Sequence, residues 1–294
     1  MDVQPVVVGI DGSSTSRDAL VWAVHEARLR GAPLHVIHAC PHPTYDPVFA
    51  GGFCLPPIVL EEEETDVALD CAGDLVRETA PEVPVETWAC RGTATSVLLD
   101  QAQDGAGLVV VGSRGLGAAG ALFLGSVSAR VAARSTVPVV VVPPGTEHTT
   151  AGPVVVGVDG TPHSTAAVRA GAREAAVRGA PLELVAAHLV PADLLVSPLT
   201  PPVDLRSAYV ERAERVVGEA ARTARALGPH LEVRTHVVEG LPTDAIAQVA
   251  GSTASLVVLG SRGHGLLTGP VLGSVSQSVL HHATGPVMVV HAQD

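Results

Sequence analysis

The chain has 294 residues, of which 47% are hydrophobic and 16% are charged, and it carries a formal net charge of −12. This composition is typical of a globular protein and excludes a disordered one. No apolar run approaches the roughly 20 residues that cross a bilayer, and the N-terminus lacks the basic and apolar segments of a secretory signal. The negative charge disfavours nucleic acid and anionic membranes as partners. The cysteines have neither zinc-site nor redox spacing, so we expect reduced thiols in a cytoplasmic protein.

The second half of the chain repeats the first. The motif Gly112-Ser-Arg-Gly115 returns as Gly260-Ser-Arg-Gly263, so the residue numbers of the two copies differ by 148. The same interval separates other matching residues along the chain. The total length suits two domains of about 150 residues each. We therefore predict tandem domains over residues 1–147 and 148–294.

The predicted elements follow one order in each half. In the first half, unbroken apolar runs indicate strands at 6–8, 34–37, 108–111 and 139–142, and an alternating segment at 83–85 indicates a strand nearer an edge. Between them, helical spacing indicates helices around 19–27, after 61–64, at 97–102 and at 126–134. The second half gives strands at 154–156, 182–185, 231–233, 256–259 and 287–290. Unbroken runs are typical of parallel sheets covered on both faces. Each half is thus predicted to be an α/β doubly wound module, a five-stranded parallel sheet flanked by helices.

The repeated glycine motif has the features of a phosphate site. Gly112 ends the fourth predicted strand, Gly115 lies in the turn that follows, and Gly125 opens the fourth helix. A helix N-terminus offers unpaired N–H groups and a partial positive charge, and glycine lets a phosphate approach the backbone. Ser126 and Ser128 have hydroxyls that can cap the helix or donate to phosphate oxygens. The alternative is structural: the glycines only form a tight turn, and the serines only cap a helix.

All 18 basic residues are arginines, so a Walker-type phosphate loop with its lysine is excluded. Arg114 can instead supply a charge-assisted contact. Asp11 and Asp159 each end the first strand of a half, where a carboxylate can accept hydrogen bonds from a base or ribose. We expect them at the base end of the crevice, too far from the phosphates to activate water. The alternative is that Asp11 simply caps the first helix, although neighbouring serines offer caps too.

The spacing Gly-x2-Gly-x9-Gly-Ser in both halves, with an aspartate that ends the first strand in Val-Val-Val-Gly-Ile-Asp-Gly, resembles the ATP-binding branch of the universal stress protein family over nearly the whole chain. The resemblance implies strand order 3-2-1-4-5 in each domain, aspartates at adenine, and phosphates held by the glycines and the serine that follows. The candidate nucleotide-binding residues of the first half are Gly9, Asp11, Gly112, Ser113, Arg114, Gly115, Leu116, Gly117, Gly125, Ser126, Val127 and Ser128. Those of the second half are Gly157, Asp159, Gly260, Ser261, Arg262, Gly263, His264, Gly265, Gly273, Ser274, Val275 and Ser276.

The resemblance also bears on assembly, because the last strand of each module pairs between domains in that family. We expect the apolar edges at 139–142 and 287–290 to pair with each other within the chain, with a homodimer as a further level of assembly. The long loops predicted at 41–57 and 191–202 differ strongly in sequence, which leaves room for different affinities at the two sites.

Three functions remain open. The first, which we favour, is an ATP-binding stress-response or regulatory protein with one adenine nucleotide per domain and Mg²⁺ as a candidate companion of the triphosphate. The second is a slow nucleotide hydrolase or nucleotidyl-transfer enzyme on the same fold. The third is a scaffold whose crevices stay empty. The sequence has no G-x-S-x-G, H-E-x-x-H or C-x-x-C motif, and no general base is evident beside the predicted phosphates, so binding is favoured over turnover.

Overall fold

The computed structural model describes residues 3–40, 60–115, 124–146, 151–190, 205–263, 269 and 271–292. The first half contains, in chain order, β1 (Val6–Ile10), α1 (Ser14–Arg30), β2 (Leu34–Cys40), α2 (Leu60–Thr79), β3 (Val85–Arg91), α3 (Ala94–Gln103), β4 (Leu108–Gly112), α4 (Ser126–Arg134) and β5 (Val139–Val142). The second half contains β6 (Val154–Gly157), α5 (Pro162–Arg178), β7 (Leu182–His188), α7 (Leu205–Leu227), β8 (Val233–Glu239), α8 (Pro242–Ala250), β9 (Leu256–Gly260), α9 (Ser274–His282) and β10 (Val287–Val290). The long loops predicted at 41–57 and 191–202 lie outside the described residues.

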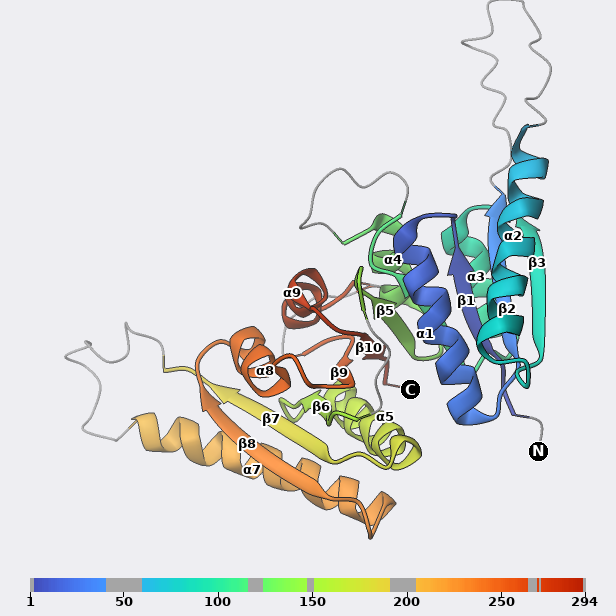
Figure 1. Ribbon diagram of the computed structural model, residues 1–294. Coiled ribbons are helices and arrows are strands. Elements are labelled where there is room, and N and C mark those ends of the chain that lie inside the picture. The colour runs from blue at the N-terminus through green and yellow to red at the C-terminus, as the bar shows by residue number, and fades with distance from the viewer. Residues whose placement is uncertain are drawn as a thin grey trace, which may run out of the picture.

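Within these ranges, ten strands form a single sheet in the order β3-β2-β1-β4-β5-β10-β9-β6-β7-β8 (Figure 1). Each half therefore has the predicted strand order 3-2-1-4-5, and its strands pair in parallel. The strand predicted to lie nearer an edge, β3, is the outermost strand of its half, as is its counterpart β8. The exact division at residues 147 and 148 stays a prediction, because residues 147–150 are not described.

The unbroken valine runs are explained by two helical layers, one on each face of the sheet. Val6 and Val8 of β1 belong to the same hydrophobic core as Trp22 of α1. Val7, which points to the opposite face, belongs to the core that includes Leu98 of α3. A strand with an apolar layer on both faces needs apolar residues at every position. None of the described helices is long and apolar enough to cross a membrane.

The two halves meet at their last strands. β5 and β10 pair antiparallel, with Val140 opposite Met288, and both residues are fully buried. The predicted pairing of the two apolar edges within one chain is thus confirmed.

A group of four charged side chains forms a second contact between the halves. Glu26 and Arg30 lie near the end of α1, and Glu174 and Arg178 lie at the corresponding positions of α5, 148 residues later. Arg30 donates to Glu26 (2.7 Å) and across the interface to Glu174 (2.5 Å). Arg178 donates to Glu174 and across the interface to Glu26 (2.6 Å). Each half thus contributes one carboxylate and one guanidinium, and each guanidinium pairs with the carboxylates of both halves.

Candidate functional site

The turn after β4 is held in place by backbone hydrogen bonds at both of its ends. The Ser113 N–H donates to Val142 of β5 (2.8 Å), and the Ser113 carbonyl accepts from the Gly125 N–H (2.7 Å). Ser261 makes the same two bonds in the second half, at 2.7 and 2.8 Å. The start of the following helix is therefore fixed beside the end of the strand in both domains.

The two helices that follow these turns lack side-chain caps. Gly125 is the N-cap of α4 and Gly273 is the N-cap of α9, and neither offers a side chain to the first-turn N–H groups. By contrast, Ser13 caps α1 and Thr161 caps α5 through their hydroxyls. The uncapped helix ends present N–H groups together with the positive end of the helix dipole, which suits an anion.

Two of the predicted hydroxyl donors are engaged inside the protein. Ser128 is buried and donates its hydroxyl to the carbonyl of Gly112 (2.6 Å). Ser276 does the same to the carbonyl of Gly260 (2.7 Å). The expectation that Ser128 can donate to phosphate is therefore wrong, because its single proton already joins the helix to the strand. Ser126 remains a candidate donor.

The glycines that end β4 and β9 allow close packing. A Cβ at Gly112 would lie 2.9 Å from the carbonyl oxygen of Thr15, and one at Gly260 would lie 2.7 Å from the carbonyl carbon of His163. Any side chain at these positions would push the strand away from the first turn of α1 or α5. Close packing alone therefore requires glycine at these two positions, whether or not they also contact a ligand.

The aspartates lie beside the glycine turn. Asp159 Oδ2 would be 2.7 Å from a Cβ at Gly263, and Asp11 Oδ2 would meet a Cβ at Gly115. The prediction that these carboxylates lie far from the candidate phosphate-binding residues is thus wrong. The physical reason is topological: the first and fourth strands of each half are parallel neighbours, so both turns leave the same edge of the sheet.

The second oxygen of each aspartate supports the loop before the first helix. Asp11 Oδ1 accepts from the Ser13 N–H (3.0 Å), and Asp159 Oδ1 accepts from the N–H and hydroxyl of Thr161 (2.9 and 2.7 Å). The helix cap itself is Ser13 or Thr161. The aspartate therefore orients the capping residue and turns its other oxygen toward the glycine.

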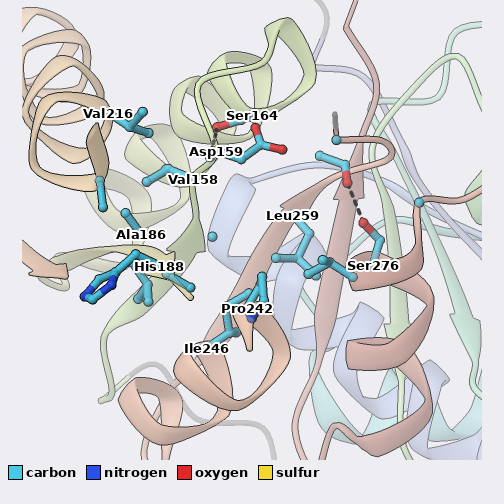
Figure 2. A pocket seen from close by; sticks show the side chains of 18 of the residues that line it. Val158, Asp159, Ser164, Ala186, His188, Val216, Pro242, Ile246, Leu259 and Ser276 are labelled. Atoms are coloured by element: carbon cyan, nitrogen blue, oxygen red, sulfur yellow. Dashed lines mark hydrogen bonds between the residues drawn. The ribbon is translucent and has the colours of Figure 1, made fainter. Parts of the chain in front are cut away.

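A cavity of about 470 Å³ opens in the second half, at the carboxyl ends of β6, β7 and β9 (Figure 2). Its volume is within the range of small-molecule sites. The cavity lies where the order of strands reverses, between β6 and β9, which is the usual ligand position in doubly wound sheets. One side is apolar, with Val158, Ala186 and Ile246. The uncapped start of α9 is on the other side, and Asp159 lies beside Val158 between the two (Figure 2).

Most candidate residues of the second half come together at this cavity. Those lining it are Gly157, Asp159, Gly260, Arg262, Gly263, Gly273, Ser274, Val275 and Ser276. Ser261 is buried behind them, and its hydroxyl lies 3.3 Å from His163 Nδ1. Leu116 and Gly117, and their counterparts His264 and Gly265, lie outside the described residues.

Residues 3–143 and 151–291 each match the model of the universal stress protein family. The chain belongs to this family. A universal stress protein of Mycolicibacterium smegmatis is 34% identical over 292 residues, which cover 97% of this chain and 96% of that one. One from Mycobacterium tuberculosis strain H37Rv is 35% identical over 300 residues, covering 97% and 96%. The crystal structure of a universal stress protein from Archaeoglobus fulgidus superposes with a TM-score of 0.67 at 20% identity, covering 100% of this chain and 98% of that chain.

The first site of this universal stress protein shares the described backbone of the second. Its turn ends, uncapped helix and aspartate all have the same contacts at positions 148 residues earlier. The segments that follow Cys40 and Gly115 in the chain are not described. The described residues therefore include the turn ends, the helix start and the aspartate of the first site, but not the two segments that follow Cys40 and Gly115.

The sequence interpretation missed the cavity residues from β7 and α7. His188 ends β7, and its Nδ1 is buried without a hydrogen-bond partner among the described residues. Tyr209 and Arg212 of α7 also line the cavity. The signal that could have indicated them is the spacing of Tyr209, Arg212, Ala213 and Val216, which lie on one face of a helix.

Arg262 has a structural contact in addition to the anion contact predicted for the motif arginine, which stays a prediction. Its guanidinium donates to the carbonyl of Gly269 within the loop between β9 and α9. It also lines the cavity. The arginine therefore bridges the turn and the later part of the same loop while remaining within reach of an anion.

Proposed function

We propose that this universal stress protein binds one adenine nucleotide in each domain and acts as an ATP-binding stress-response regulator. The observation that carries the proposal is the cavity of the second half, which joins an apolar wall to an uncapped helix N-terminus. A nucleotide has the same division into a flat, weakly polar base and a highly charged phosphate chain. The stress-response role rests on membership of the family.

The two ends of the cavity suggest the orientation of the ligand. Val158, Ala186 and Ile246 suit the adenine, while the start of α9 suits the phosphates through its free N–H groups. Asp159 lies between them and beside Gly263, where its carboxylate suits a ribose hydroxyl. It is also the candidate ligand for a Mg²⁺ that accompanies the triphosphate, since carboxylates and phosphates are preferred magnesium ligands.

Extraction of bound nucleotide from the purified protein, followed by calorimetry with ATP, tests the proposal. We expect an adenine nucleotide in the extract and up to two binding events per chain. Neither extracted nucleotide nor heat of binding for ATP, ADP or AMP would rule out the proposal and favour a scaffold with empty crevices.

Slow nucleotide hydrolysis is the second candidate function. It gains support from the position of Asp159, because its carboxylate lies beside the glycine turn rather than at the far end of the crevice. Replacing Asp159 with Asn keeps an oxygen that can accept from Thr161 but removes the base. Phosphate release from ATP that is above background and is lost in Asp159→Asn would establish the hydrolase. Equal background rates in both proteins support a binding protein.

A cytoplasmic location and a homodimer are further parts of the proposal. Light scattering on the eluting protein measures the mass of the assembly, and a value near 29.9 kDa would identify a monomer and remove the dimer.

A further inference from the structure

Helix α7 gives the second cavity a wall that the first domain does not repeat in sequence. The buried residues Ala213, Val217 and Ala224 of α7 lie 148 positions after Thr65, Leu69 and Val76 of α2, which are buried too. The two helices therefore pack on their halves in the same register. At this interval Tyr209 and Arg212 correspond to Glu61 and Glu64, whose side chains are not described.

Tyr209 and Arg212 line the cavity together with apolar residues of their own helix. They share one face of α7 with Ala213 and Val216, and all four line the cavity. Val216 lies near Val158 and Ala186, opposite the start of α9 (Figure 2). This is the half of the cavity that suits the base.

Arg212 differs from three of the other four arginines of its helix, and the fourth, Arg225, donates to the carbonyl of Val233. Arg206, Arg215 and Arg222 each have a carboxylate within 4.0 Å, namely Glu239, Glu211 and Glu219. Among the described residues, no carboxylate forms an ion pair with Arg212, which is exposed and lines the cavity. Its planar guanidinium is therefore not committed to an acid and can stack on an aromatic ring.

We propose that Tyr209 and Arg212 form a stacking clamp for the purine base in the second site, and that the two corresponding positions of the first half, Glu61 and Glu64, do not supply one. The inference deepens the proposed function and rests on it. Tyrosine and guanidinium both offer a flat face to a purine, whereas the glutamates that the sequence places in α2 offer none. The two sites consequently bind the same nucleotide with unequal affinity, and the second site is the tighter one.

Calorimetry with adenosine and with ATP tests the clamp in the full-length protein. We expect Tyr209→Ala to weaken the tighter event about tenfold for both ligands. We expect Arg212→Gln to weaken the tighter event about fivefold. Arg212→Lys should not restore the affinity, because lysine carries the charge but has no planar group that can stack on the base. Arg215→Gln, on the same helix but outside the cavity, is the matched control and should leave the affinity for both ligands unchanged.

The outcomes separate this inference from the proposed function. No binding of ATP by the unmodified protein would overturn both. Binding by the unmodified protein that Tyr209→Ala and Arg212→Gln leave unchanged would overturn the clamp alone. If Arg212→Gln weakens ATP but not adenosine, and lysine restores the affinity, Arg212 contacts phosphate and the clamp is likewise rejected.

Discussion

Gly263 lies where the carboxylate of Asp159 meets the glycine turn of the second site. A Cβ there would be 2.7 Å from Asp159 Oδ2, a distance that forces the carboxylate to move. We expect Gly263→Val to weaken ATP binding at the second site by more than about tenfold, because the added side chain occupies the space beside the proposed ribose and phosphates. Calorimetry should then show one nucleotide per chain.

Gly218→Ala provides a matched control, since a Cβ at Gly218 on α7 has only the end of the Arg222 side chain within 4 Å, at 3.8 Å.

The free energy of unfolding of Gly263→Val should change by less than about 1 kcal/mol, because only the end of a side chain must shift. Two equal nucleotides per chain in Gly263→Val would show that the glycine turn is not part of the site.

Residue type alone left these roles undecided. The sequence identified Gly112, Ser128 and Asp11 as a set, and the structure brings all three to one edge of the sheet. The structure also gives the three residues different roles: Gly112 and Ser128 join β4 to α4 through a hydrogen bond, and Asp11 lies beside the glycine turn. A hydroxyl or a glycine has several possible partners, and only the packed neighbours decide which one it has.

At the scale of elements, periodicity predicted most of the fold. The valine runs of β1, β4 and β5 and the edge position of β3 were all predicted, because a strand covered on both faces has an unmistakable pattern. The cavity wall from α7 was not predicted. A helix with an apolar face shows that it packs on the sheet, but its pattern does not reveal how far it extends beyond the ends of the strands.

The end of β10 contacts the neighbouring domain through a half-buried imidazole. His291 follows β10, and its Nε2 donates to the carbonyl of Ala133 in α4 (3.1 Å). Burial lowers the pKa of His291, despite the opposing effect of this hydrogen bond, and His163 and Arg262 lower it further. The imidazole therefore takes up a proton less readily in the folded protein than in the unfolded chain.

The lowered pKa of His291 predicts a loss of stability in acid. Because the folded-state pKa of His291 is below the unfolded value of 6.5, the unfolded chain binds more protons, and stability is lost as pH falls through 6.5. We expect His291→Leu to lose less unfolding free energy than the unmodified protein between pH 7.5 and 5.5, by up to about 1 kcal/mol. His25 and His35, whose pKa values are lowered mainly by burial, contribute to the pH dependence of the unfolding free energy in both proteins. Identical slopes in urea unfolding would exclude His291 as a contributor.

On the scale of the whole molecule, duplication created an interface as well as a second site. In either half alone, Glu26 with Arg30 or Glu174 with Arg178 would be an ordinary pair four residues apart on a helix surface. Only the two-fold arrangement of the halves brings them together and buries them. This is why the repeated sequence predicted two domains and an edge pairing, while the charged contact between α1 and α5 remained unpredicted.

The buried pair of Arg178 and Glu26 makes the interface sensitive to the loss of one partner. Their side chains are 1% and 0% exposed, so removing Arg178 leaves the two buried carboxylates of Glu26 and Glu174 to share the single guanidinium of Arg30. We expect Arg178→Met to lower the unfolding free energy by about 3 kcal/mol, and Arg77→Met, which removes an exposed pair with Asp74, to lower it by less than about 1 kcal/mol. Adding Glu26→Gln to Arg178→Met should recover part of the loss, because it removes one of the two repelling charges. If Arg178→Met and Arg77→Met cost the same in urea unfolding, the four charges do not hold the two domains together, and the β5–β10 pairing carries the interface.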